Sequence, residues 1–339
     1  MKIADLVHQS KLDLVFKPIY SGIGHVLMFH RIHDKNDHIL TKNLIVNPEY
    51  LENYINYFIK KEIDIISLDE LYNRITSNYR IKRFVVFTFD DGYVDNLTHA
   101  LPIFKKYNAP FTVFITTGFP DHTVVLWWYL LEDLILKNNK IRFTDGPVDF
   151  VFDASTYDEK LVAYQRIRRY ILQSNRMNLL QKLKSVFYAQ GYDLYDLTEK
   201  LALSWDQVIE LSKHPLVTIG AHAMNHCALN QLTKTEVKTE IEESVKIISE
   251  KTGKPVLYFA YPFGSENEVG QREISITSNC NIKMAFTARS GNIFRQHASH
   301  LFSLPRIDIR ESFNTTKLDL FIHGMTPCIK NRFRRVITV

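Results

Sequence analysis

Two adjacent aspartates, Asp90 and Asp91, follow the apolar run Phe84–Phe89, and Gly92 comes directly after them. A short run rich in Val and Phe predicts a buried strand, so both acids stand at a strand's carboxyl end, where parallel sheets collect their active sites. Because adjacent residues leave a strand in different directions, one carboxylate can bind a cation while the other accepts a proton. Alternatively, Asp-Asp-Gly is a simple turn in which one Asp caps a helix that begins near Val94.

Two histidines four residues apart, His222 and His226, follow a second predicted strand, Leu216–Gly220. The spacing lets both imidazoles face one point if the segment turns helically. Two His and one carboxylate suit a divalent ion, zinc above all, with cobalt, nickel or manganese as alternatives, and they leave positions open for water and substrate. A His pair alone is more often a surface feature. Its combination with Asp91, also at a strand's carboxyl end, predicts a metal site.

Short apolar runs rich in Val, Ile and Phe alternate with helix-length segments along most of the chain, which indicates an α/β fold with a mostly parallel sheet. Periodicity alone leaves open whether this sheet is open or closed into a barrel. The predicted strands are 24–31, 63–67, 84–89, 111–116, 216–220, 256–260 and 284–287, and the clearest predicted helices are 48–61, 205–213 and 234–251.

Helix starts and stops support this alternation. Ser204 precedes one predicted helix, and Thr233 with Glu236 forms a capping box ahead of another, which Gly253 ends. Residues 121–203 interrupt the pattern with a helix-rich segment. We therefore expect a single domain over residues 1–339 with a helical insertion at about 121–203.

A third motif, FAYPFG at 259–264, ends another predicted strand. Together with TFDDG at 88–92 and HAMNH at 222–226, it resembles the first three motifs of the polysaccharide deacetylases, also called carbohydrate esterase family four. The resemblance spans roughly residues 20–310. It implies a distorted (β/α) barrel of about seven parallel strands that uses a divalent metal to hydrolyse N-acetyl, or sometimes O-acetyl, groups on sugars.

The same resemblance implies residue roles. Asp90 matches the family's catalytic base, and Asp91, His222 and His226 match its metal ligands. HVLMFHRI at 25–32 resembles the circularly permuted branch typified by poly-N-acetylglucosamine deacetylases, in which an N-terminal strand supplies the acid, and His30 matches that position. The alternative for His30 is a core histidine bonded to a carbonyl.

His25 and His33 are weaker candidates for the acid, because residues an odd number apart do not share a strand face with His30. The third motif has Ala260 where many members have an Arg that contacts the catalytic Asp. Arg306 in LPRID is the candidate to replace that Arg, unless it forms a surface ion pair with Asp308.

Four aromatic residues are expected to contact the substrate. Tyr261 and Phe263 belong to the third motif, and a backbone N–H near Phe263 would stabilise an oxyanion. Trp127 and Trp128 would stack on sugar rings, although packing of the insertion onto the barrel explains them equally well.

The composition is that of an ordered globular protein, with 45% hydrophobic residues and a net charge of +5. No nucleic-acid motif is present, and no apolar run is long enough to span a membrane. The tail KNRFRRVITV is basic; it could touch anionic lipid or a phosphorylated substrate, or simply be solvated. Its clustered cations are Lys330, Arg332, Arg334 and Arg335.

Three scattered cysteines and a first stretch without a signal-like apolar run favour a cytoplasmic protein. We therefore expect an N-deacetylase acting on an amino-sugar precursor of surface polysaccharide, either nucleotide-linked or lipid-linked. Two alternatives remain open at this point, a hydrolase of a non-sugar amide and a sugar-binding barrel without catalysis.

Overall fold

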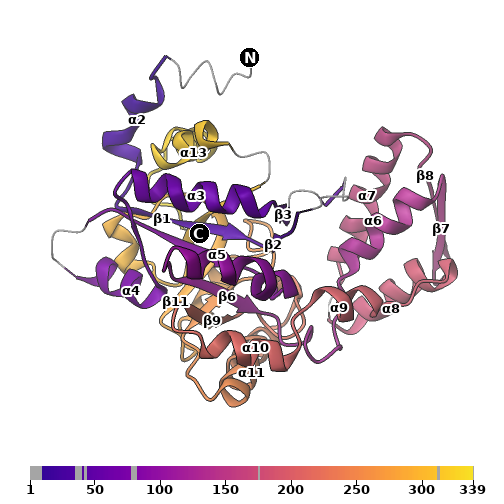
Figure 1. The fold of residues 1–339 in the computed structure, drawn as a ribbon. Coiled ribbons are helices and arrows are strands. Elements are labelled where there is room, and N and C mark those ends of the chain that lie inside the picture. The colour runs from indigo at the N-terminus through magenta and orange to yellow at the C-terminus, as the bar shows by residue number, and fades with distance from the viewer. Residues whose placement is uncertain are drawn as a thin grey trace.

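Seven parallel strands close into a barrel in the computed structural model, which describes residues 10–34, 40–41, 44–77, 82–174, 176–310 and 314–338 (Figure 1). The order around the barrel is β1-β12-β11-β10-β9-β6-β5, and β5 pairs back to β1 along its whole length. The barrel strands are β1 (Gly24–Phe29), β5 (Phe84–Phe89), β6 (Phe111–Ile115), β9 (Val217–Ala221), β10 (Tyr258–Ala260), β11 (Met284–Ser290) and β12 (Leu304–Asp308). The expected distorted barrel of seven strands is confirmed.

Membership of the barrel differs from the prediction at one strand. The predicted strand 63–67 shrinks to β4 (Asp64–Ile65), which pairs with the start of β5 on the edge that β6 occupies farther along. Its place in the barrel is taken by β12, which lies between β11 and β1. The predicted strand 24–31 also stops before His30, and the chain continues as β2 (Arg31–Ile32), which pairs with β3 (Ile45–Val46) in a separate sheet.

The barrel strands are apolar on both faces because both faces are buried. Side chains such as Val26, Val86 and Phe114 fill the barrel interior. Their neighbours Leu27 and Phe87 point outward and pack beneath the surrounding helices. This alternation places the residues just beyond the strand ends above a packed interior layer.

The helices around the barrel begin and end where capping chemistry predicts. The Asn47 side chain accepts the Glu49 N–H, Ser204 and Thr233 form capping boxes, and Gly253 ends its helix with φ 68°. The barrel helices are α3 (Pro48–Lys60), α4 (Leu68–Thr76), η2 (Asn96–Ala100), α5 (Leu101–Lys106), α10 (Trp205–Lys213), η4 (Leu229–Gln231), α11 (Lys234–Thr252), α12 (Gln271–Thr277) and η5 (Arg295–Ser299). Three more, α2 (Asp13–Tyr20), α13 (Thr315–Ile322) and α14 (Met325–Lys330), bring the two ends of the described chain together.

The expected insertion forms a lobe beside the barrel, at the right of Figure 1, with an apolar core of its own. Its elements are α6 (Trp127–Lys137), β7 (Lys140–Asp145), β8 (Val148–Asp153), α7 (Tyr157–Leu172), α8 (Arg176–Phe187), η3 (Tyr188–Gln190) and α9 (Asp196–Leu201). The antiparallel hairpin β7–β8 was not predicted. Its signal was the two-residue turn Gly146-Pro147, in which Gly146 has φ 57°, between strands that alternate apolar and polar residues.

Within the described part of the chain, no helix combines the length and the apolar character that crossing a bilayer demands. All three cysteines are described and buried, and none of them forms a disulfide.

Candidate metal centre and active site

The two adjacent carboxylates diverge directly after β5. The Asp90 N–H continues the barrel ladder by donating to the Phe29 carbonyl at 2.9 Å, whereas Asp91 adopts a left-handed conformation with φ 74° and is followed by Gly92 at φ 85°. Left-handed backbone is uncommon outside glycine, and Asp is among the residues that tolerate it best. The turn therefore aims Asp90 toward Arg306 and Asp91 toward the two histidines.

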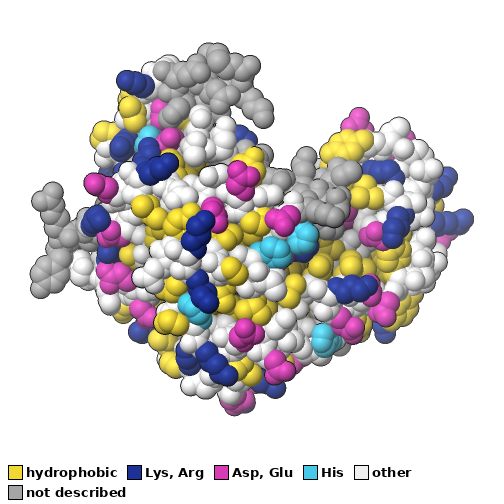
Figure 2. All heavy atoms as spheres, viewed as in Figure 1, with side chains coloured by type: hydrophobic (Ala, Val, Ile, Leu, Met, Phe, Trp, Pro, Cys, Tyr) yellow, Lys and Arg dark blue, Asp and Glu magenta, His cyan; other side chains and the backbone are white. Residues whose placement is uncertain are grey.

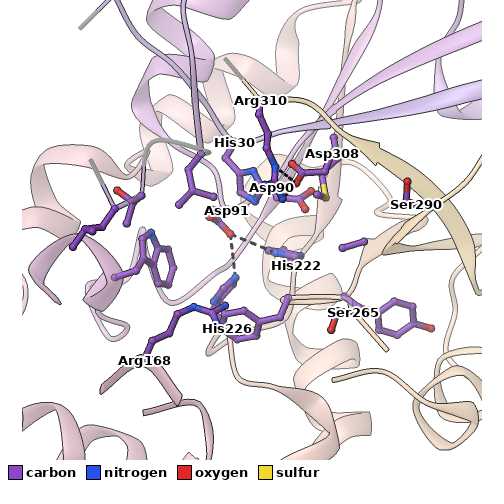
Figure 3. A pocket seen from close by; sticks show the side chains of 18 of the residues that line it. His30, Asp90, Asp91, Arg168, His222, His226, Ser265, Ser290, Asp308 and Arg310 are labelled. Atoms are coloured by element: carbon purple, nitrogen blue, oxygen red, sulfur yellow. Dashed lines mark hydrogen bonds and ion pairs between the residues drawn. The ribbon is translucent and has the colours of Figure 1, made fainter. Parts of the chain in front are cut away.

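Asp91, His222 and His226 meet at one point, although they come from distant parts of the chain (Figure 3). Asp91 Oδ1 lies 3.4 Å from His222 Nε2 and 3.1 Å from His226 Nε2, and all three side chains are buried. Tetrahedral zinc with bonds of about 2.0–2.2 Å places its ligand atoms about 3.3–3.6 Å apart. The separation from His222 lies within this range and that from His226 is slightly shorter, so the three ligand atoms are close enough together to share one divalent ion.

The hydrogen bonds around this cluster also fit a cation. His222 Nδ1 lies 2.7 Å from the Ala260 carbonyl, so it carries the ring proton, and the Nε2 lone pair faces Asp91. Among the described residues, no group donates a hydrogen bond to Asp91 Oδ1. Burial alone would raise the pKa of Asp91, but positive charge on the imidazole side, carried by His226 and His222 when they are protonated, holds it well below its usual value. An ion between the lone pairs would satisfy all three groups.

The His222–His226 segment is not helical, contrary to the condition attached to the prediction. It is a loop in which Ala223 and His226 have positive φ, at 61° and 47°. Its shape is fixed by Glu240 of α11, whose carboxylate accepts the Met224 and Asn225 N–H groups at 3.0 and 2.9 Å. Sequence reasoning missed Glu240, although a lone acid on the apolar face of a predicted helix was a usable signal.

Arg306 lies against Asp90 in a two-pronged ion pair, with both nitrogen–oxygen distances at 2.7 Å. Its Nε donates to the Thr287 carbonyl at 3.0 Å, which fixes the guanidinium. The alternative partner, Asp308, pairs with Arg310 instead. Burial is the largest influence and would raise the pKa of Asp90, but the charge and hydrogen bonds of Arg306, together with the charges of His222 and His30, outweigh it, so the pKa is lower than usual and Asp90 stays ionised.

His30 lies just beyond the carboxyl end of β1, beside Asp90 at the pocket wall (Figure 3). Its Nδ1 is buried and, within the described chain, has no hydrogen-bond partner, so the alternative of a core histidine bonded to a carbonyl is not found for that atom. His25 lies away from the pocket and bonds Asn292, and burial together with Arg83 lowers its pKa to about 3.

A pocket of about 700 Å³ opens over these residues. All four aromatic residues expected to contact substrate line it, but the polar groups of two of them bond within the protein. Tyr261 donates its hydroxyl to the Phe302 carbonyl at 2.9 Å, and Trp128 donates its indole N–H to Tyr93 at 3.2 Å. Trp128 and Phe263 also pack on the His226 ring, with centroid distances of 5.1 and 4.7 Å. Trp127 and Trp128 therefore pack within the protein and also line the pocket, and their stacking on sugar rings stays a prediction.

Most of the remaining pocket residues were not foreseen, with the exception of Lys330, which belongs to the basic tail considered as a contact for a phosphorylated substrate. Tyr164 and Arg168 reach the pocket from α7 of the insertion, and Lys330 reaches it from α14. Leu40 and Thr41 line another part, held by the buried Glu132 of α6, which accepts the Leu40 N–H at 2.5 Å. An exposed Arg on an amphipathic helix carries no sequence signal, so only the fold could reveal Arg168.

The family model for polysaccharide deacetylases matches residues 77–149 and 154–284, which is more than half of the chain. This protein belongs to the polysaccharide deacetylase family. A curated member, YxkH of Bacillus subtilis strain 168, is 19% identical over 301 residues, covering 88% of this chain and 76% of the relative. The family match begins after His30 and ends before Arg306.

Solved structures agree with the fold. The deacetylase PplD of Streptococcus pyogenes, solved with acetate, has a TM-score of 0.57 at 20% identity and covers 88% of this chain and 97% of its own. IcaB from Ammonifex degensii has a TM-score of 0.56 at 15% identity and covers 89% and 97%. The fold of this polysaccharide deacetylase is therefore similar to theirs. Its barrel includes β1 and β12, which pair at Leu27 and Ile307.

Proposed function

We propose that this protein is a metal-dependent N-deacetylase that releases acetate from an N-acetylated amino sugar. The observation that carries the proposal is the buried cluster of Asp91, His222 and His226 beside an ionised Asp90 held by Arg306. A mere sugar-binding protein has no use for a second carboxylate next to a metal site. Membership of the polysaccharide deacetylase family supports the same reaction.

Asp91, His222 and His226 would hold the divalent ion, for which we propose zinc because two imidazoles and one carboxylate with open positions are typical of catalytic zinc sites. When bound, such an ion polarises a carbonyl and lowers the pKa of water from 15.7 toward about 7. The ligand side chains are held in place by Ala260 and by the Glu240-bound loop. The ion would thus meet a site whose geometry is already set.

The remaining groups have complementary roles. Asp90 would accept a proton from the attacking water, and Arg306 keeps it ionised and oriented for that purpose. His30, with a buried and unpartnered Nδ1, would donate a proton to the leaving amine. A proton donor matters more for an amine than for an alcohol leaving group, so His30 favours N-deacetylation over O-deacetylation.

The substrate we propose is a phosphorylated sugar precursor of surface polysaccharide, modified in the cytoplasm. Three cations line the pocket, Arg168, Arg310 and Lys330, and only Arg310 has an ion-pair partner within the described chain. With Asp90 paired to Arg306 and Asp91 facing the ion, Arg168 and Lys330 leave positive charge for a phosphate. Both nucleotide-linked and lipid-linked sugars carry such a group, and three cysteines without a disulfide suit a reducing compartment.

The experiment is acetate release from purified protein before and after chelation. Metal-free protein should release none from N-acetylated sugars and should recover with zinc, cobalt, nickel or manganese. Unchanged release without metal would overturn the proposal. Screening N-acetylated sugars beside simple non-sugar amides separates a sugar deacetylase from a general amide hydrolase.

A further inference from the structure

Exposed apolar side chains concentrate on two short helices at the two ends of the described chain. Six of the fourteen exposed large hydrophobic residues in the described part of the protein belong to α2, α14 or the residues next to them. Val15 and Phe333 are the most exposed, at 70% and 68%. The six residues are Leu12, Leu14, Val15, Ile19, Ile329 and Phe333, and we call their surface the α2–α14 face.

The two helices form one surface because they pack together. α2 contacts both α13 and α14, and the Tyr20 hydroxyl donates to the Phe333 carbonyl at 3.4 Å. On the inner side of α2, the buried Asp13 bonds His323 at 2.6 Å. This polar contact fixes which side of α2 faces the protein, and it leaves Leu12, Val15 and Ile19 directed outward.

The charge around the α2–α14 face is of one sign. Residues 10–21 and 325–338 contain six basic residues, all exposed, and a single acid, Asp13, which is buried against His323. The basic residues are Lys11, Lys17, Lys330, Arg332, Arg334 and Arg335. Figure 2 shows hydrophobic and basic side chains next to one another over α2, at the upper left.

We propose that the α2–α14 face docks on the surface of an anionic phospholipid bilayer. An amphipathic helix that presents apolar residues among lysines and arginines lies in the plane of a membrane interface, with its apolar side chains among the headgroups and acyl boundary. Each basic residue near such a surface adds attraction to anionic lipid. Self-association through the same face would instead bring twelve like charges together, which charge repulsion disfavours.

Docking in this way has a consequence for the pocket. Lys330 is the last residue of α14 and lies in the sequence between Ile329 and the arginines of the tail. It also lines the pocket over the metal cluster. The docked protein therefore holds one side of its pocket close to lipid headgroups. Membrane docking does not require the deacetylase reaction, so the two proposals can fail separately.

The test is co-sedimentation of the full chain with vesicles of phosphatidylcholine alone or mixed with phosphatidylglycerol. Binding should require phosphatidylglycerol and weaken as salt rises, because salt screens the attraction. The double variant Val15→Asp with Ile19→Asp should lose vesicle binding more than tenfold. Arg332→Gln and Arg334→Gln should each weaken it about fivefold at low salt.

The matched control is Val148→Asp with Val151→Asp on the β7–β8 hairpin, where both valines are exposed at 49%. It introduces the same charges on a different surface and should leave vesicle binding unchanged, and thermal unfolding should show that both double variants are folded. The proposal is overturned if vesicles that contain phosphatidylglycerol fail to bind the protein, or if Val15→Asp with Ile19→Asp binds as well as the parent. It is also overturned if that variant only disrupts a dimer, since the occupant would then be a second copy.

Discussion

The pocket has two walls of different character, one built by the barrel and one by the insertion. On the barrel wall, Asp90, Asp91, His222 and His226 are at most 7% exposed, and hydrogen bonds or ion pairs to neighbouring elements fix their positions. On the insertion wall, Arg168 of α7 is exposed and makes no ion pair within the described chain. A fixed, buried wall suits chemistry, which depends on accurate placement, whereas an exposed wall can change residues without disturbing the fold.

If this comparison holds, substitutions on the barrel wall should reduce turnover, and those on the insertion wall should alter only substrate preference.

The largest effect is expected at the metal ligands. Asp91→Ala or His226→Ala should remove bound zinc and lower acetate release to the level of the metal-free protein. The reason is that catalytic zinc is held by three protein ligands, and each variant leaves only two. Metal content measured by atomic absorption beside acetate release checks this. The control is His33→Ala, because the His33 ring packs on His99 and is not a proposed ligand; this variant should keep its metal. Zinc retained by Asp91→Ala or His226→Ala would contradict the ligand assignment.

Asp90→Asn is expected to separate metal binding from turnover. The variant should bind zinc normally, since Asp90 is not a ligand, but lose about 10²–10⁴-fold in kcat, because an amide cannot accept the proton. The matched control is Asp308→Asn, which changes a pocket acid that pairs with Arg310. Asp308→Asn should retain most turnover. Equal rates for the two variants would remove Asp90 from the role of base.

Arg306→Gln should change the pH dependence of the reaction. With Arg306 gone, burial remains and raises the pKa of Asp90, so the carboxylate is protonated at a higher pH than in the parent. The acid limb of the profile of kcat/KM against pH should therefore move to higher pH.

Arg31→Gln is the control for Arg306→Gln, because Arg31 forms another buried ion pair, with Asp95 at 2.8 Å. Breaking either pair should cost about 3–5 kcal/mol of stability. Only Arg306→Gln should shift the acid limb, and a shift in both variants would show a structural effect rather than an effect on Asp90.

The barrel wall was largely predictable from sequence, and the insertion wall was not. Asp90, Asp91, His222 and His226 follow apolar strands, and parallel strands must bring their carboxyl ends to one rim. Barrel closure was not decided by the sequence pattern itself, because apolar runs read alike in open and closed sheets. For the same reason the pattern did not give the strand order, in which β12 lies beside β1 while β4, within the predicted strand 63–67, pairs with β5.

Some residues shape the site only through tertiary contacts. The sequence can indicate such a residue only when it interrupts a local pattern. Glu240 interrupts an apolar helix face and could have been noticed. Arg168 lies on the polar face of α7, where an arginine is common and therefore gives no indication of a role in binding. Leu40 and Thr41 line the pocket because Glu132, 92 and 91 positions farther along the chain, accepts their N–H groups. No local sequence pattern indicates a contact over such a separation.

The smallest effect is expected from Arg168→Gln, the substitution on the insertion wall. Removing one exposed cation should cost a phosphorylated substrate about 1 kcal/mol of binding, equivalent to about a fivefold rise in KM, with kcat unchanged. The measurement compares N-acetylglucosamine 1-phosphate with N-acetylglucosamine, for which KM should not move. Arg169→Gln, one position along the same helix and not part of the pocket lining, is the matched control. A fall in kcat with both substrates would place Arg168 with the chemistry and abolish the distinction between the walls, whereas a KM effect confined to the phosphorylated sugar would make that distinction sharper.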